Sequence, residues 1–109
     1  MKKLFVIISI LVSSLIGAGY SEGFKLYKQA KKELRKDNVT KANTLFLEAK
    51  IIFSDNSQKN SSNALLKLAE LYCHGWGVDK DETKAKNYLQ KAQKLGASFI
   101  SDKCLKKLK

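Results

Sequence analysis

The stretch from Ala64 to Gly96 reads ALLKLAELYCHGWGVDKDETKAKNYLQKAQKLG and decides how this chain folds. On both sides of a central Gly-Trp-Gly-Val turn, apolar residues recur three and four positions apart, which is the spacing of an amphipathic helix. A hairpin of two such helices cannot bury its own apolar stripe and has to stack on neighbouring elements. The stretch therefore predicts a structural repeat unit rather than an active site.

Each helix of this block has a predicted buried face and predicted ends. The first helix places on one face Ala64, Leu65, Leu68, Leu71 and Tyr72. It ends at His74-Gly75-Trp76-Gly77, where two glycines allow positive φ and a tight reversal. Asp81 is placed to cap the second helix, which ends at Gly96 and buries Ala85, Tyr88, Leu89, Ala92 and Leu95.

Two further amphipathic helices precede the block. Positions Tyr27, Ala30 and Leu34 mark the first, which begins near Gly23 and is interrupted at residues 36–38. The second ends near Ser54, has Asp37 or Asn38 placed to cap it, and buries Val39, Ala42, Leu45, Phe46, Ala49, Ile52 and Phe53. The small polar residues 54–62 then predict a loop between the two hairpins.

A short terminal helix follows the block, because Ile100, Cys104 and Leu108 keep the helical spacing. A weak internal repeat supports the same architecture: Asn38, Lys41, Ala42 and Ala49 recur 43 positions later as Asp81, Lys84, Ala85 and Ala92. The absence of proline also favours helices throughout the chain. We predict an all-α fold, an αα-hairpin repeat stack of about five helices.

Residues 1–20 have the three parts of a secretory signal peptide. Lys2 and Lys3 precede an apolar run from Leu4 to Ile16, and the small residues 17–19 suit a signal peptidase. The run is shorter than the roughly 20 residues of a stable membrane span, so cleavage near residues 17–21 is favoured over an uncleaved anchor. We therefore predict an exported protein, periplasmic or secreted, without a stable membrane span after cleavage of the leader.

The chain is strongly basic, with 21 Lys and Arg against 10 Asp and Glu among its 109 residues. Such a balance is typical of proteins that bind nucleic acid or anionic surfaces. Arg35 is the single arginine, however, and phosphate and base recognition favours the forked guanidinium group. The lysines lie along every predicted helix, so we interpret them as a solvated surface. Attraction to an anionic envelope surface or glycan is the alternative, and we expect no nucleic-acid partner.

The block also resembles a known repeat. The residues that carry this resemblance are Ala64, Leu68, Ala69, Tyr72, Gly75, Gly77, Val78, Asp81, Lys84, Ala85, Tyr88, Lys91, Ala92 and Gly96. Their order and spacing resemble the Sel1-like repeat, a relative of the tetratricopeptide repeat. The resemblance implies one domain over 21–109, with a degenerate repeat at 23–53, a clear repeat at 61–96 and a capping helix at 98–109. It also implies a right-handed superhelix that binds proteins or peptides and shares no catalytic residues.

Some exported bacterial members of this family are rich in cysteine, and a few are called penicillin-binding or β-lactamase proteins. The resemblance therefore implies β-lactam binding or hydrolysis as an alternative function. Those members usually carry a cysteine after Lys-Ala at the end of a second helix. This chain departs from them, because Gln93 stands at the matching position.

Cys73 and Cys104 are the two cysteines of the chain. An even count in an exported protein favours a disulfide, here between the end of the third helix and the terminal helix. Closing the loop between them adds about 3 to 4 kcal/mol in the chain-entropy model. Against the bridge, Cys104 aligns with Leu68 at a 36-residue repeat, which is an imperfect register for pairing with Cys73. Two buried free thiols are the alternative.

The sequence shows no motif for catalysis or for a metal. His74 and two cysteines without a C-x-x-C pair give too few ligands for a zinc site. Serine-nucleophile motifs are missing, and the carboxylates are scattered over caps and surfaces. His74 is expected beside the negative pole of its helix. We therefore expect no catalytic residues, no cofactor and no metal.

The hypothesis that these patterns favour is a non-catalytic, exported protein that binds a protein or peptide along its inner helix face and turn loops. The candidate binding residues are Trp76, His74 and Lys80 in and beside the turn. The indole of Trp76 either packs on the hairpin or stands exposed as an anchor for a partner. A stack of two repeats is also a candidate for weak homodimerisation that covers its ends.

Overall fold

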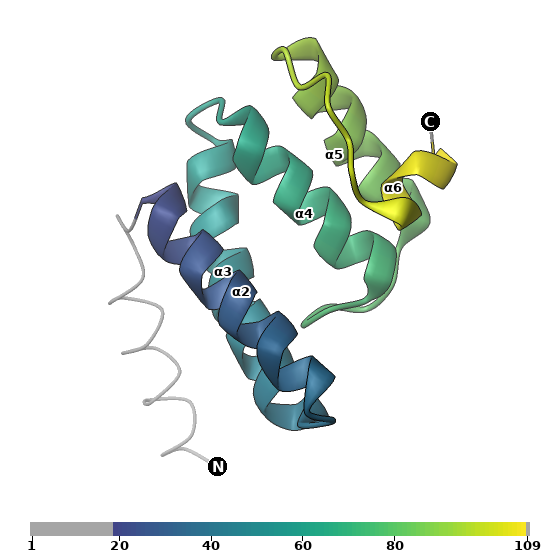
Figure 1. The fold of residues 1–109 in the computed structure, drawn as a ribbon. Coiled ribbons are helices and arrows are strands. Elements are labelled where there is room, and N and C mark those ends of the chain that lie inside the picture. The colour runs from purple at the N-terminus through teal and green to yellow at the C-terminus, as the bar shows by residue number, and fades with distance from the viewer. Residues whose placement is uncertain (1–18, 109) are drawn as a thin grey trace.

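The computed structural model describes residues 19–108, and this part of the chain forms five helices and no strand (Figure 1). The helices are α2 (Tyr20–Arg35), α3 (Val39–Ser57), α4 (Ser62–His74), α5 (Glu82–Lys94) and α6 (Lys103–Leu108). The prediction of an all-α stack of about five helices is confirmed.

Most of the predicted leader, residues 1–18, lies outside the described residues. The last residue of the predicted leader, Tyr20, is the first residue of α2. None of the helices between Tyr20 and Leu108 combines the length and the apolar character that crossing a membrane requires.

Helix α4 is the centre of the molecule (Figure 1). Helices α2 and α3 form one antiparallel hairpin and α4 and α5 form the second, while α3 packs on α4 and the short α6 closes against α4 and α5. Because α4 has neighbours on two sides, it buries apolar residues on two faces. Leu68 and Leu71 belong to the core shared with α2 and α3, whereas Ala69 and Cys73 belong to the core shared with α5 and α6.

The first core is aromatic. Tyr27 of α2 and Phe46 and Phe53 of α3 are buried together, with edge-to-face ring pairs at 5.9 Å and 6.4 Å between centroids. Around them lie small residues that let the helices approach, namely Ala30, Ala42, Ala49 and Ala64. The second core is smaller, and its buried members on α5 are Ala85, Leu89 and Ala92.

The predicted loop at residues 54–62 is wrong in its extent. Helix α3 continues to Ser57, and residues 58–61 alone separate it from α4. Asn56 Nδ2 donates to the carbonyl of Ile52, and Ser57 Oγ donates to the carbonyl of Ser54. These side chains bond back onto the helix instead of competing with it, so the polar composition does not end the helix.

The two hairpins differ in how their second helices are capped. Asp81 caps α5 as predicted, accepting from the amide of Lys84 at 3.0 Å. The predicted cap of α3 by Asp37 or Asn38 is wrong. Asn38 holds the N-cap position, but its side chain makes no capping hydrogen bond. Its Nδ2 donates to Glu33 Oε2, and Asp37 takes φ 60° in the turn.

The terminal helix is shorter than predicted. It begins at Lys103, so Ile100 lies before it in the irregular segment 97–102, where it is buried against the second core. Asp102 explains the late start, since its Oδ1 accepts from the amide of Leu105 at 3.0 Å and caps the helix.

Candidate functional site

The Gly-Trp-Gly-Val turn docks on the first hairpin. The amide of Gly77 donates to Asn43 Oδ1 on α3 at 3.2 Å. Gly75 and Gly77 both have φ +73°, and a Cβ on Gly77 would lie 2.7 Å from the Cβ of Phe46. The turn therefore needs glycine for its backbone conformation and for its close approach to α3.

This turn places Trp76 between the two hairpins. The indole is half-buried, stacks on Phe46 with ring centroids 5.0 Å apart, and meets the edge of Tyr27 at 6.2 Å. It also stacks on His74 at 4.0 Å. The ring thus contributes to the first core, and part of its surface stays open to solvent.

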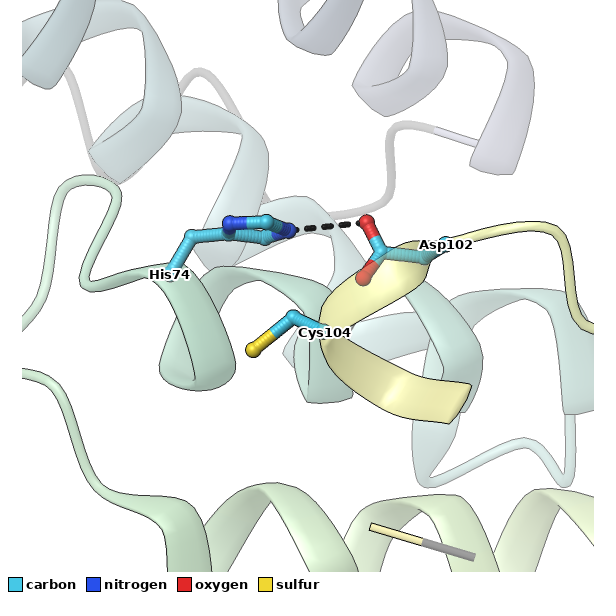
Figure 2. Close-up of side chains that lie close together, drawn as sticks. All are labelled: His74, Asp102 and Cys104. Atoms are coloured by element: carbon cyan, nitrogen blue, oxygen red, sulfur yellow. Dashed lines mark hydrogen bonds and ion pairs between the residues drawn. The ribbon is translucent and has the colours of Figure 1, made fainter. Parts of the chain in front are cut away.

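His74 faces the C-terminal segment rather than solvent alone (Figure 2). Its Nε2 donates to Asp102 Oδ2 at 2.8 Å, and the two side chains are 27% and 12% exposed. One carboxylate oxygen of Asp102 therefore accepts a hydrogen bond from the last residue of α4, and the other oxygen caps α6. His74 does lie at the C-terminal end of its helix, but its hydrogen-bond partner is this carboxylate.

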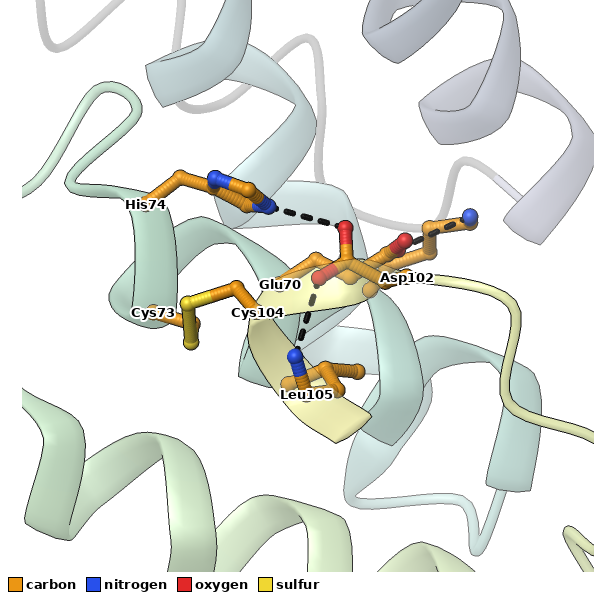
Figure 3. A network of polar contacts seen from close by, with 7 residues as sticks. Glu70, Cys73, His74, Asp102, Cys104 and Leu105 are labelled. Carbon is orange, nitrogen blue, oxygen red and sulfur yellow. Dashed lines mark hydrogen bonds and ion pairs between the residues drawn. A yellow bond between two sulfur atoms is a disulfide. The ribbon is translucent and has the colours of Figure 1, made fainter. Parts of the chain in front are cut away.

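Cys73 and Cys104 form a disulfide beside this pair, with their Cα atoms 6.1 Å apart (Figure 3). The objection from repeat register is wrong, because α6 does not follow the repeat spacing. The irregular segment 97–102 sets its position instead, and brings Cys104 over α4. The predicted cysteine pair is therefore at bonding distance.

A metal would need this disulfide to be open. The ligand atoms of His74, Asp102 and Cys104 lie within 4.8 Å of one another (Figure 2). Zinc binds the cysteine thiolate, and the sulfur of Cys104 is already bonded to Cys73. The imidazole of His74 is hydrogen-bonded to the carboxylate of Asp102. This hydrogen bond and the disulfide therefore attach the C-terminal segment to α4.

Lys80, the third predicted binding residue, lies on the solvent side of the turn. Its ammonium is 3.8 Å from Glu82 Oε1, and both side chains are more than 60% exposed. An ion pair this exposed contributes little to stability. Lys80 is also not one of the residues that line the groove described next.

Glu70 on α4 is the one buried charged residue among residues 19–108, with 7% of its surface exposed. Lys67 Nζ lies 2.8 Å from its Oε2. Burial raises the pKa of Glu70 above its usual value of 4.5, and Lys67 opposes this shift without cancelling it. Burial and the nearby Glu70 also raise the pKa of the Tyr27 hydroxyl.

Glu70 lies at the base of an open groove of about 580 Å³ between α2, α4 and Ser101, which we call the basic groove. Its basic lining residues are Lys25, Lys28, Lys31, Lys32, Arg35 and Lys67. Glu70 is the one carboxylate among the described residues that line it. The groove therefore concentrates positive charge in a concave surface.

An aromatic pocket of about 170 Å³ adjoins the basic groove and shares Phe24, Lys67, Glu70 and Ser101 with it. Its other lining residues include Tyr20, Leu66 and Phe99. Phe99 is 81% exposed, the most exposed large apolar side chain of the described chain. The disulfide and the hydrogen bond between His74 and Asp102 hold the segment that carries Phe99.

Sequence reasoning missed this groove, although part of the signal was present. Lys25, Lys28, Lys32 and Arg35 are spaced three, four and three positions apart, which places them on one helix face. The interpretation of an evenly solvated lysine surface overlooked this face. Lys67 and Ser101 join it through the packing of α4 and the return of the C-terminal segment, which local spacing does not encode.

The fold places the chain among proteins built from stacked αα-hairpins. A family model described as Sel1 repeat matches residues 16–33 and 62–96. The chain belongs to the Sel1-like repeat family. No curated protein and no solved structure matches it at a significant level.

Proposed function

We propose that the chain is a non-catalytic protein-binding module whose partner lies in the basic groove. Sel1 repeats are generally protein-interaction modules, which supports this class of function. The observation that carries the choice of site is the groove itself, a concavity of about 580 Å³ walled by two helices and the C-terminal segment. Concave surfaces of stacked repeats offer long contacts to an extended peptide.

The groove also has the composition of a binding surface. It combines the aromatic side chains of Phe24 and Tyr27 with charged groups, as interfaces combine an apolar centre with a polar rim. Trp76, His74 and Lys80 stay predicted contacts of the same partner at the turn. They are secondary in this proposal, because Trp76 and His74 also have structural contacts.

Photo-cross-linking tests the proposed site. A photoreactive phenylalanine analogue replaces Gln29, an exposed residue of the groove, and Gln90, an exposed residue of α5, serves as the matched control. In the native cell envelope we expect a defined partner at Gln29 and none at Gln90. The captured protein is then purified and titrated against the chain. No capture at Gln29, or the same proteins from both positions, contradicts the proposal.

We propose further that the protein is exported, on the strength of the leader-like residues 1–20 and the cysteine pair. Disulfides persist in oxidising compartments, which agrees with export. Expression of the full chain in a bacterial host, followed by fractionation and intact mass, tests this. We expect an envelope or medium fraction with a new N-terminus near residues 17–21. A cytoplasmic product that still begins at Met1 contradicts it.

A further inference from the structure

The basic groove carries far more positive than negative charge. Five of its cations come from one face of α2, and Lys67 of α4 lies opposite them. The one carboxylate, Glu70, is already paired with Lys67 at 2.8 Å. Because field lines concentrate in a concave surface, this groove attracts anions more strongly than the same charges spread over a convex helix.

Several of these lysines are held over aromatic rings. Lys28 Nζ lies 4.9 Å from the ring centroid of Phe24, and Lys67 Nζ lies 4.5 Å from that of Tyr27. Lys31 Nζ lies 5.4 Å from Tyr27 and 5.8 Å from Trp76. These cation–π contacts already restrict the lysine side chains, so the side chains lose less conformational freedom when a ligand binds. The positive groups are therefore pre-organised.

The neighbouring aromatic pocket adds a subsite for an apolar side chain, although Asp102 and Ser101 also line it. Phe99 stands 81% exposed at its edge, and Tyr20 and Phe24 stack with ring centroids 5.9 Å apart beside it. Since Phe24 and Lys67 belong to both the pocket and the groove, one ligand can reach both. A chain segment with carboxylates and an adjacent apolar side chain matches this surface.

The chain itself is a poor occupant. Its net charge is +11, so a second copy brings more positive charge to a positive groove. Its own first 20 residues carry Lys2 and Lys3 and no carboxylate, and the same argument applies to them. Charge complementarity therefore selects a different, acidic molecule.

We infer that the basic groove and the aromatic pocket together bind an acidic segment of a partner protein, with an apolar side chain beside its carboxylates. This inference rests on the proposed function and names the chemistry of the partner. A protein segment is favoured over nucleic acid, because five of the six cations are ammonium groups rather than guanidinium forks. It is also favoured by the family, whose repeats generally bind proteins.

Fluorescence anisotropy with labelled 12-residue peptides tests the charge requirement on the purified, disulfide-bonded protein. The acidic peptide contains glutamates and one central phenylalanine, and the control peptide has every glutamate replaced by glutamine. We expect the acidic peptide to bind at least tenfold more tightly at low salt and to lose affinity as salt rises. Equal binding of the two peptides overturns the inference. So does displacement of the acidic peptide by a 12-nucleotide single strand at a lower concentration than that of the unlabelled peptide.

Two double variants with the same change of net charge locate the binding face. The K28E/K32E variant reverses two exposed cations of the groove, and the K86E/K94E variant reverses two exposed cations of α5. We expect at least a tenfold loss of affinity in the first and less than a twofold loss in the second. Circular dichroism and thermal melts establish that both variants are folded. Equal losses show a net-charge effect and overturn the inference.

The apolar subsite has its own test. Substitution of Phe99→Ser is expected to weaken the peptide that contains phenylalanine about fivefold, as lost aromatic contacts do. An all-glutamate peptide without phenylalanine should bind both proteins alike, and equal losses for the two peptides overturn the apolar part. A partner cross-linked at Gln29 through a segment without carboxylates overturns this inference but leaves the proposed function intact. Peptide binding without any partner at Gln29 overturns the proposed function instead.

Discussion

Helices α3 and α5 take equivalent places in the two hairpins, and both bury a pair of alanines at matching positions. Ala42 and Ala49 in α3 and Ala85 and Ala92 in α5 are all fully buried, 43 positions apart in sequence. Small residues seven apart lie on one face and let a neighbouring helix approach closely. The repeat is therefore real at the level of helix packing, even where the rest of the two sequences differs.

The means of closing the two hairpins are different. The first is closed by large rings, with Tyr27 packed on Phe46 and Phe53. In the second, Leu89 is the one large buried side chain on α5, and closure comes from the Asp81 cap, the docked glycine turn and the disulfide to α6. A helix with few large buried side chains can therefore complete a small stack when covalent and backbone constraints add to its packing.

The largest expected effect breaks the second hairpin through its disulfide. Reduction, or the double substitution C73A/C104A, should lower the free energy of unfolding by about 3 to 4 kcal/mol, because the bond closes a loop of 31 positions. Urea unfolding followed by circular dichroism measures it. We expect hydrogen exchange to rise first at residues 97–108 and to change least in α2 and α3.

The double variant is also the control for the reductant. Its unfolding should not respond to a phosphine reductant, whereas that of the wild type should. If oxidised and reduced wild-type protein unfold at the same urea concentration, the second hairpin does not depend on its disulfide. The proposed difference in how the two hairpins are closed is then wrong.

The next effect tests how the turn of the second hairpin docks on the first. Gly77→Ala should cost about 3 kcal/mol, since a left-handed L-residue costs about 1 to 2 kcal/mol and the new methyl group would collide with Phe46. Gly96→Ala is the matched control. It also has positive φ, but no atom lies within 4 Å of its added Cβ, so about 1 kcal/mol is expected. Equal losses in thermal or urea melts would show that the contact with α3 is unimportant.

Much of this fold follows from local sequence. Apolar spacing located all five helices, the paired glycines marked the turn, and Asp81 was recognisable as a cap because its side chain acts three residues away. Such features depend on neighbours within one or two helical turns. The end of α3 was missed because Asn56 and Ser57 can either leave a helix or bond back onto it, and composition does not decide between these.

The candidate site was less predictable, because it depends on contacts between distant residues. Asp102 hydrogen-bonds to His74, 28 positions away in the sequence, and helix packing places Lys67 in the same groove as the cations of α2. Neither contact can be read from the spacing of residues within one helix. The turn residue Trp76 was recognised as notable, but whether its indole packed inward depended on Phe46 and Tyr27 in the other hairpin.

The smallest effect concerns Glu70 on α4, the helix that both hairpins share. Burial raises its pKa above 4.5, so between about pH 4.5 and the raised pKa the folded state binds more protons than the unfolded state. Its contribution to stability is therefore fully present below pH 4.5 and is lost as the pH rises through the raised pKa. Glu70→Gln keeps the shape and removes the charge. We expect the variant to melt a few degrees above the wild type at pH 8 and at the same temperature near pH 4. A lower melting temperature at pH 8 would show that pairing with Lys67 outweighs the cost of burial.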